Sequence, residues 1–479
     1  MSLAEQIDQA FAPVSAAVNA VIFYSVSIGG VSLPLVVIWL IAAAIFLTIA
    51  FRFINIRGFT HAVALVSGRK RGHLAAGVGE ISHFQALSSA LSGTVGLGNI
   101  ASVPVAIAIG GPGAVFWMIL AGFFGMSSKF AECALAVKYR RVEPSGRTIG
   151  GPMFYIEKAF DKVGIGWLGK PAAIFFAVMT MGASVSVFQV NQSHAQFANV
   201  TGVAAPVVFG VIMAGLVLIV TLGGIKRIGA VSGVLVPMMA ALYLGCGLII
   251  IAMNADKLPA AIATIFSSAF GLDAAGGGLV GALINGVKRA TYSNEAGVGS
   301  SAIAHSAVKT SEPMTEGFVA LLEPFIDTVI VCTVTALVVI VTGAYEPYLY
   351  QSAVRGIEIT SSAYASAFPW FPWLLLVASM LFAFTTLVSW AFYGAQAAAY
   401  LFGPSRATDV GFKIVLCLLL STGAAISLAS IINFIDAMLF GMCIPNIIAL
   451  YILYPELKRD LESYDRRIRR ADARRDSAS

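Results

Sequence analysis

The sequence predicts an all-α polytopic membrane protein that crosses the bilayer with 11 helices. Hydrophobic residues make up 58% of the 479 residues and charged residues only 11%, whereas an average soluble domain has about 25% charged residues. Runs such as 33–53, 206–222 and 410–428 carry few or no charges, and about 20 apolar residues make one membrane-spanning helix. Because no backbone group can stay unpaired in lipid and these runs are longer than barrel strands, they are expected to be helices.

The basic residues predict how these helices are oriented. The expected spans are residues 33–53, 85–108, 113–137, 171–193, 204–222, 229–253, 276–308, 315–342, 371–401, 410–429 and 433–454. Of the 30 Lys and Arg residues, 25 fall on one side of these spans, whereas only Lys257 and Arg355 fall on the other. Since basic loops stay in the cytoplasm, we expect an external amino terminus and a cytoplasmic carboxy terminus, in the plasma membrane (the inner membrane of a bacterium or archaeon).

The chain is expected to divide into six parts. They are an extracytoplasmic amphipathic segment (1–32), an extra first helix with a basic cytoplasmic linker (33–84), a five-helix repeat (85–253), an external loop (254–275), a second, inverted five-helix repeat (276–454) and a basic cytoplasmic tail (455–479). The preference for cytoplasmic bases accounts for the tail. Nucleic-acid binding or contact with anionic lipid is the alternative.

Two glycine-rich stretches interrupt the expected helices. The second span contains Gly93-Thr94-Val95-Gly96-Leu97-Gly98-Asn99, and the seventh contains Ser293-Asn294-Glu295-Ala296-Gly297-Val298-Gly299-Ser300. Gly costs a helix about 1 kcal/mol relative to Ala, so both stretches should unwind near mid-membrane. Close helix packing is the alternative. Because the stretches begin five spans apart, spans 2–6 and 7–11 are predicted as inverted repeats, an arrangement typical of secondary transporters.

Unwinding a helix exposes backbone groups that can bind charged ligands. The freed N–H groups at the start of a half-helix suit a carboxylate, and the freed carbonyls suit Na⁺ or an ammonium group. Both ends of a zwitterionic amino acid could be held in this way. In span 9, Thr385 and Ser389 share one helix face, which suits Na⁺, while Thr386 and Trp390 share the neighbouring face. Alternatively, these hydroxyls bond their own helix.

Other polar groups within the spans have open roles. Gln189 and Gln192 either face the bundle interior or mark the outer water interface. Lys129 could pair locally with Glu132, and His305 is expected to pack or cap. Buried charges are costly and usually paired, so we favour structural clamps over gates or relays, with Glu295 as the functional exception because it lies in the second break. The charges in question are Lys129, Glu132, Lys288, Arg289, Glu295, Glu323 and Asp327.

Six motifs together resemble the alanine/glycine:cation symporter family over residues 33–455. They are Phe84-Gln85-Ala86-Leu87, residues 96–100, Gly110-Gly111-Pro112-Gly113-Ala114, Gly286-Val287-Lys288-Arg289, residues 293–299 and Phe325-Ile326-Asp327-Thr328. The resemblance implies the LeuT-type 5+5 inverted repeat, preceded here by one extra helix. It also implies uptake of alanine, glycine or similar small neutral amino acids, coupled to Na⁺ or in some cases to H⁺.

The resemblance also assigns roles to individual residues. It implies a substrate site formed by Thr94, Gly96, Gly98, Asn99, Gln189, Tyr292, Asn294, Thr386 and Trp390, and a sodium site formed by Ser92, Val95, Thr385 and Ser389. Three departures from the family pattern stand out. Leu97 replaces a threonine and could narrow the pocket, Ala395 replaces a glutamate, and Glu316 replaces a glutamine.

The leading hypothesis is therefore a sodium-coupled symporter that imports small neutral amino acids by alternating access. We expect a monomer with no cofactor, no metal other than sodium, and no nucleic-acid partner. The same fold could instead carry another small solute or couple to protons. A channel is disfavoured by the paired breaks, and an enzyme by the absence of phosphate-loop, metal-protease or nucleophile-elbow motifs.

Overall fold

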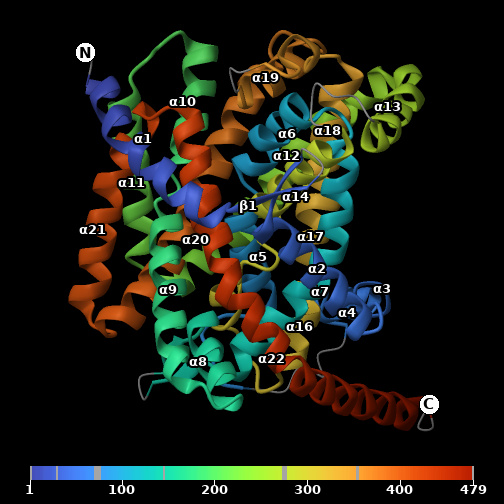
Figure 1. The fold of residues 1–479 in the computed structure, drawn as a ribbon, viewed down its shortest axis with the longest axis vertical. Helices are drawn as coiled ribbons and strands as arrows, with labels where there is room; N and C mark the ends of the chain where they lie inside the picture. The colour runs from blue at the N-terminus through green and yellow to red at the C-terminus, as the bar shows by residue number, and fades with distance from the viewer. Residues whose placement is uncertain are drawn as a thin grey trace.

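The computed structural model describes residues 3–28, 31–69, 77–143, 146–271, 278–351 and 355–476. Helices dominate, and the long ones run along the longest axis of the molecule (Figure 1). The first half contains α1 (Leu3–Ile22), β1 (Ser25–Ile28), β2 (Val31–Pro34), α2 (Leu35–Ala50), α3 (Ile54–Arg57), α4 (Phe59–Val66), α5 (His83–Thr94), the π-helix η2 (Gly98–Ser102), α6 (Val103–Gly110), α7 (Ala114–Lys138), β3 (Arg141–Val142), β4 (Thr148–Ile149), α8 (Pro152–Lys162), α9 (Gly166–Ser184), α10 (Val187–Thr201), α11 (Pro206–Thr221) and α12 (Gly224–Met253).

The second half begins with a short 3₁₀ turn and ends with the longest helix. It contains η3 (Ala255–Lys257), α13 (Leu258–Phe270), α14 (Gly278–Asn294), α15 (Ala302–His305), α16 (Pro313–Ala320), α17 (Leu322–Pro324), the π-helix η5 (Phe325–Cys332), α18 (Thr333–Val341), η6 (Glu346–Tyr348), α19 (Ile357–Ala365), α20 (Phe371–Phe402), α21 (Arg406–Thr422), η7 (Gly423–Ala425) and α22 (Leu428–Asp476).

In the part of the chain that the structure describes, each predicted span falls mostly on helical residues, interrupted at the two glycine-rich stretches. Within the described part of the chain, seven helices are long and apolar enough to cross a membrane, or eight if the bent pair formed by α5 and η2–α6 counts as one. α2 and α11 have 16 residues each, and α14 has 17 because it stops at the second glycine-rich stretch. Eleven crossings therefore remain a prediction, as does the division into two inverted repeats.

The sequence predicted only helices, but the structure also contains short β-strands. Two small antiparallel sheets are present, β1 with β2 and β3 with β4. In the first, Ser25 pairs with Pro34 and Ile28 with Val31, so the hairpin links α1 to α2. β2 overlaps the first two residues of the predicted span 33–53, whereas the other three strands lie outside the predicted spans.

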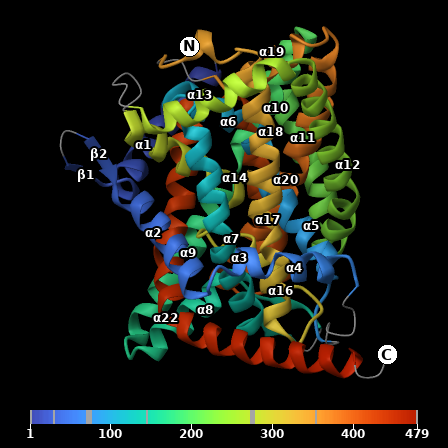
Figure 2. The same cartoon turned by 90° about the vertical axis from the view of Figure 1, so that its right-hand side faces the viewer.

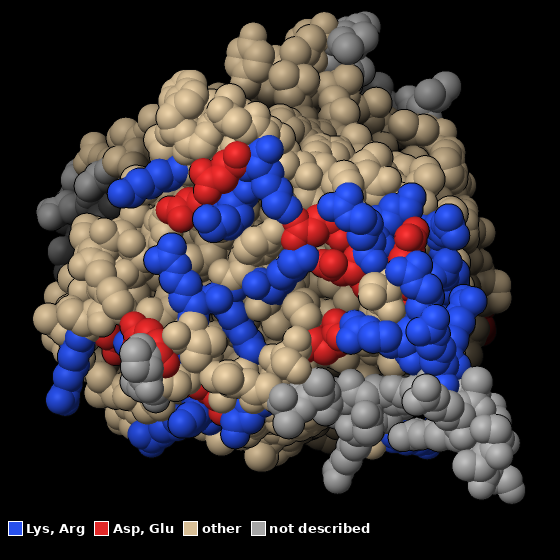
Figure 3. All heavy atoms as spheres, turned by 90° about the horizontal axis from the view of Figure 1, so that it is seen from below, with Lys and Arg blue, Asp and Glu red and all other residues tan. Residues whose placement is uncertain are grey.

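The two ends of the chain lie at opposite ends of the long axis (Figures 1 and 2). α1 packs along α22, where the Ser15 hydroxyl donates to the carbonyl of Ser430 (2.8 Å). α22 continues without interruption past residue 454, where the tail was expected to begin, and its last part runs across the lower end of the molecule (Figure 2). Lys and Arg side chains gather on that lower face (Figure 3).

The centre of the bundle is built from helices that approach closely. α14 packs along α7, and a Cβ on Gly286 would come within 2.4 Å of the carbonyl oxygen of Ala114. Only glycine permits this approach, which brings the second glycine-rich stretch against α7. Gly286 therefore allows close packing of two helices, whereas the glycines of the two glycine-rich stretches lie where the helices are interrupted.

Candidate functional site

The first break interrupts the helix that begins at α5. Ser82 and Gln85 form a capping box that starts α5, and the helix ends at Thr94. The axis then bends by 43° before η2 and α6 continue. The Asn99 side chain accepts a hydrogen bond from the Gly96 amide (2.8 Å), and the Gln189 side chain accepts one from the Leu97 amide (3.1 Å). In an uninterrupted α-helix, the Gly96 and Leu97 amides would donate to the carbonyls of Ser92 and Gly93. Both carbonyls therefore lack their usual donor from the helix.

The second break is longer. α14 ends at Asn294, and helix resumes at Ala302. Glu295, Gly297 and Gly299 adopt positive φ angles of 56°, 84° and 86°. Such angles are uncommon for a residue other than glycine, so the carboxylate-bearing Glu295 is held in a left-handed conformation. The Asn294 side chain stabilises this turn by accepting a hydrogen bond from the Ala296 amide (2.9 Å).

Both breaks are tied to the same π-helix, η5. Asn99 donates to the Asp327 carboxylate (2.7 Å), and Asn294 donates to the Thr328 hydroxyl (2.9 Å). Ser293 also donates to the Asp327 carboxylate (2.7 Å). π-helical turns are rare and often occur at functional sites. This one joins two unwound segments that lie about 200 residues apart in the chain.

A narrow cavity with an empty volume of about 300 Å³ lies between the two breaks. Its lining residues lie in or directly beside α5, η2, α9, α10, α14, α20 and α22 and are Gly93, Thr94, Gly98, Ala183, Ser186, Gln189, Tyr292, Glu295, Trp390, Ile435 and Leu439. Polar groups from both breaks face it, and Trp390 and Tyr292 provide aromatic walls.

Five residues expected at the substrate site line this cavity: Thr94, Gly98, Gln189, Tyr292 and Trp390. The other four, Gly96, Asn99, Asn294 and Thr386, are not among its lining residues. Gly96 and Thr386 lie directly beside it. A Cβ on Gly96 would be 2.4 Å from the Thr386 hydroxyl oxygen and 3.3 Å from the Gln189 amide oxygen. Among the residues that the structure describes, the buried Thr386 hydroxyl has no hydrogen-bond partner, so it is available to a ligand.

Asn99 acts as a clamp in this structure. Its side chain is fully buried and joins the first break to Asp327, Ser293 and the Cys332 thiol. Asn294 holds the second break in a similar way. Gln192, whose side chain accepts a hydrogen bond from the Ile357 amide (3.0 Å), is buried and links α10 to α19. Gln189 and Gln192 therefore both face the bundle interior.

We predict that Asn99→Ala lowers the apparent Tm of the detergent-solubilised protein. The substitution removes the donor to Asp327 and the acceptor for the Gly96 amide, and each buried polar group left unpaired costs about 1–3 kcal/mol. Thermal unfolding followed by intrinsic fluorescence measures the effect. Asn285→Ala is the matched control, because Asn285 bonds only the Gly281 carbonyl of its own helix (2.9 Å). An equal Tm for the two variants would contradict the clamp.

A second polar cluster lies where α5 meets α20. Ser92 and Ser389 share a short hydrogen bond, Ser389 also donates to the Ser89 carbonyl (2.9 Å), and Ser232 donates to Ser92 (3.1 Å). The freed Ser92 carbonyl belongs to the same segment. Oxygen atoms of hydroxyls and carbonyls are the ligands that hard cations prefer.

The four residues expected at the sodium site are not all gathered there. Ser92 and Ser389 are in contact, and Val95 caps α5 one turn further on. The Thr385 hydroxyl instead bonds the Leu381 carbonyl of its own helix (3.0 Å) and contacts the Met239 sulfur (3.5 Å). The alternative considered for hydroxyls in lipid, bonding to their own helix, thus holds for Thr385.

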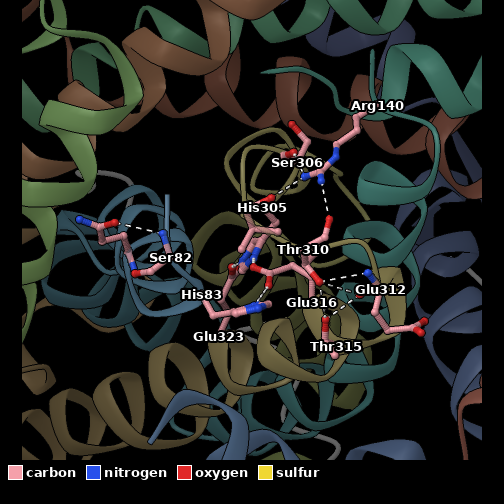
Figure 4. A network of polar contacts seen from close by, with 12 residues as sticks. Ser82, His83, Arg140, His305, Ser306, Thr310, Glu312, Thr315, Glu316 and Glu323 are labelled. Atoms are coloured by element: carbon pink, nitrogen blue, oxygen red, sulfur yellow. Dashed lines mark hydrogen bonds and ion pairs between the residues drawn. The ribbon is translucent and has the colours of Figure 1, made fainter. Parts of the chain in front are cut away.

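Buried charged groups join the lower ends of the two broken helices. His305 lies between Glu316 and Glu323, with each nitrogen–oxygen distance 2.5 Å (Figure 4). Glu316 also pairs with His83 at the start of α5, and Glu323 pairs with Lys129 (2.9 Å). The suggested local pair of Lys129 with Glu132 is wrong, because Lys129 points across to α17, while Glu132 accepts from Asn446 (2.7 Å).

Arg140 holds the segment after the second break against the same end of the molecule. Its guanidinium donates to the carbonyls of Ser306 (2.7 Å), Val308 (2.6 Å) and Thr310 (2.6 Å), as Figure 4 shows in part. A short parallel bridge pairs Ile81 with Val308 beside it. His305 therefore does more than pack or cap, since it belongs to a network that closes the lower end of both broken helices.

Six residues that line the cavity were not in the predicted substrate set: Gly93, Ala183, Ser186, Glu295, Ile435 and Leu439. Glu295 carried a signal, as a carboxylate within a glycine-rich break, but it was not placed with the substrate set. Ser186 lies at the interruption between α9 and α10, four residues after Gly182, and a serine at such a position is not distinctive. Ile435 and Leu439 come from α22 and are ordinary apolar residues at i,i+4 spacing, so no local pattern distinguishes them.

The three residues that depart from the family pattern, Leu97, Ala395 and Glu316, are all buried. Leu97 is fully buried, but it is not among the residues that line the cavity. Ala395 is also buried, next to Gly394, where a Cβ would lie 2.4 Å from the Ser184 hydroxyl oxygen. Each carboxylate oxygen of Glu316 hydrogen-bonds a histidine, one oxygen to His83 and the other to His305. A buried carboxylate at this position is thus compensated by partners present in this chain.

Comparison with known proteins places this geometry in a family. The chain is 37% identical over 421 residues to the sodium/alanine symporter AgcS of Methanococcus maripaludis, covering 88% of this chain and 92% of that protein. It is 39% identical over 407 residues to a putative sodium/proton-dependent alanine carrier protein, YrbD, of Bacillus subtilis, covering 81% of each. The crystal structure of MhsT in complex with L-phenylalanine superposes with a TM-score of 0.58 at 15% identity, covering 78% of this chain and 89% of that one, and shows a shared LeuT-type fold.

The family model for the sodium:alanine symporters matches residues 17–478, nearly the whole chain. This match agrees with the family resemblance that the sequence motifs indicated. The chain therefore belongs to the sodium:alanine symporter family and is a membrane transporter rather than an enzyme.

Proposed function

We propose that this protein couples the inward movement of sodium to the uptake of a small neutral amino acid, with alanine and glycine as the expected substrates. The observation that supports this proposal most is the narrow cavity between the two helix breaks, lined by polar and aromatic residues from both sides. Its narrowness favours a small side chain, and its position between two unwound helices suits alternating access, in which the two halves of the bundle rock around a fixed site.

The two breaks offer opposite charge character to a zwitterion. At the first break, Gly98 begins a helical segment whose positive amino-terminal end suits the substrate carboxylate. At the second break, the Glu295 carboxylate lines the cavity and accepts a hydrogen bond from Ser300. This carboxylate suits the substrate ammonium group. Trp390 and Tyr292 would then surround a methyl group or a hydrogen, which limits the size of the side chain.

Sodium is proposed to bind at the serine cluster between α5 and α20. Ser92, Ser389 and the carbonyls of Ser92 and Val95 would supply its oxygen ligands. Because the Ser92 carbonyl is free only while α5 is interrupted, sodium binding would stabilise the unwound first break. Because the substrate also binds at this unwound break, sodium binding would favour substrate binding.

The distribution of basic residues supports a cytoplasmic lower face, with the carboxy terminus inside and the amino terminus outside. The protein is proposed to reside in the plasma membrane and to function as a monomer. Proton coupling is the second candidate, and the buried network of His83, Glu316, His305, Glu323 and Lys129 favours it, because these titratable groups form a hydrogen-bonded chain.

The test is uptake of labelled alanine by proteoliposomes under an inward sodium gradient, under a proton gradient, and without either. We expect uptake with sodium at least tenfold above the gradient-free rate, inhibited by unlabelled glycine and alanine but not by large amino acids. Equal uptake without sodium would contradict sodium coupling. Uptake driven by the proton gradient alone would favour the second candidate, and competition by another solute class would identify different cargo.

A further inference from the structure

A charged pocket lies on the lower face, far from the cavity between the breaks. It forms where the end of α2 and the end of α3 meet the last part of α22, and its empty volume is about 740 Å³. Its lining consists of five basic residues, two acidic residues and three apolar residues, namely Arg52, Arg57, Lys458, Arg466, Arg469, Glu462, Asp465, Ala50, Phe51 and Leu461. Segments about 400 residues apart in the chain thus build one site.

The basic residues of this pocket exceed its acidic residues by three. Arg57 pairs with Asp465 at 3.7 Å. In the part of the chain that the structure describes, Arg52 and Arg466 have no ion-pair partner within 4.0 Å. Figure 3 shows the Lys and Arg side chains of this face gathered most densely on the right, the side on which α22 ends. Guanidinium groups that converge without partners suit an anion with several oxygens, such as a phosphate ester.

The backbone holds Arg52 at this pocket at an energetic cost. Arg52 and Phe53 have φ angles of 54° and 56°, so two consecutive residues other than glycine are left-handed. Both amides are paired, Arg52 with the Ile49 carbonyl (2.9 Å) and Phe53 with the Thr48 carbonyl (2.7 Å). Strain of this kind persists where the surrounding structure enforces it, and it concentrates at functional positions.

The pocket lies beside an apolar surface that faces the bilayer. α2 is one of the expected membrane spans, and three large apolar side chains next to Arg52 are exposed: Ile49 by 61%, Phe53 by 45% and Ile56 by 59%. A free phosphate ion would use only the basic residues. A phospholipid would use both features, with its headgroup among the arginines and its acyl chains against α2. The geometry points to a binding site for an anionic phospholipid.

The lipid site is connected to the transport machinery through the last part of α22. In that part, Tyr464 hydrogen-bonds His61 of α4 (2.8 Å), and Arg467 pairs with Glu312 (2.5 Å) directly before α16. α16 carries Glu316, which belongs to the buried network at the lower ends of both broken helices. A lipid that bridges Arg52 and Arg466 would hold this part of α22 against that network. Its occupancy is therefore expected to change the transport rate as well as stability.

The test compares the double variant R52Q/R466Q with the wild type, both as full-length purified protein. Native mass spectrometry counts cardiolipin and phosphatidylcholine retained in detergent, and thermal unfolding is measured with each lipid. We expect the wild type to retain cardiolipin in preference to phosphatidylcholine and to gain Tm with it. We expect the variant to bind cardiolipin roughly 30-fold more weakly, since each basic residue beside an anionic lipid contributes about a factor of five.

The control variant is K226Q/R227Q, which removes two exposed basic residues from the first turn of α12. The proposal holds only if this control keeps wild-type cardiolipin binding. An equal loss in the two variants would mean nonspecific attraction to a basic surface and would overturn it. So would unchanged binding in R52Q/R466Q, or inorganic phosphate alone producing the full gain in Tm, which would identify a free-anion site.

Discussion

Replacing Trp390 with alanine is expected to lower the efficiency of alanine uptake by on the order of 100-fold. Trp390 is 4% exposed and forms the aromatic wall of the cavity beside Thr94 and Gly98. Fitting one methyl group into a hydrophobic pocket is worth roughly 1–3 kcal/mol, or 10–200-fold in efficiency. Removing the indole also opens the cavity to water, so the substrate loses both its contact and its enclosure.

Initial uptake rates across a range of alanine concentrations, normalised to monodisperse reconstituted protein, measure this effect. Trp390→Phe should recover part of the rate, because a smaller ring retains some contact with the substrate. Trp373→Ala serves as the matched control, since Trp373 lies on the same helix but is 53% exposed. If Trp390→Ala transports at the wild-type rate, the cavity between the breaks is not the substrate site.

The positions of the breaks could be predicted because glycine has a strong local effect. Three glycines within six residues, from 93 to 98, cannot be explained by composition alone, and the helix does end at Thr94. The spacing of the second stretch identified the other broken helix. Polar side chains near a break were then natural candidates, and Thr94, Gln189 and Trp390 do line the cavity.

What the sequence could not supply was the direction in which each side chain points. Asn99 lies in the break and is polar, yet it faces η5 rather than the cavity, because the Asp327 carboxylate needs its amide as a donor. Lys129 and Glu132 lie three residues apart, but Lys129 crosses to Glu323, and Glu132 turns to Asn446. Pairings between helices that are distant in sequence decide such cases, and periodicity within one helix contains no information about them.

The last strong prediction concerns the ion rather than the substrate. Ser389→Ala is expected to raise the sodium concentration that gives half-maximal uptake at least about tenfold, since losing one buried oxygen partner costs roughly 1–3 kcal/mol. Ser389 contacts Ser92 on α5 and the Ser89 carbonyl, so its hydroxyl lies where the first broken helix meets α20. Maximal uptake at saturating sodium should change much less, because the substrate cavity stays intact.

The measurement is the sodium dependence of alanine uptake in proteoliposomes, made at fixed membrane potential. Ser379→Ala is the control, because Ser379 is buried on the same helix and donates only to the Leu376 carbonyl of that helix (2.8 Å). If Ser389→Ala leaves the sodium dependence unchanged, sodium does not bind at the serine cluster. A fall in maximal uptake at every sodium concentration, with no shift in sodium affinity, would instead assign Ser389 to the packing of α5 on α20. The two outcomes separate ion coordination from structural support at one atom.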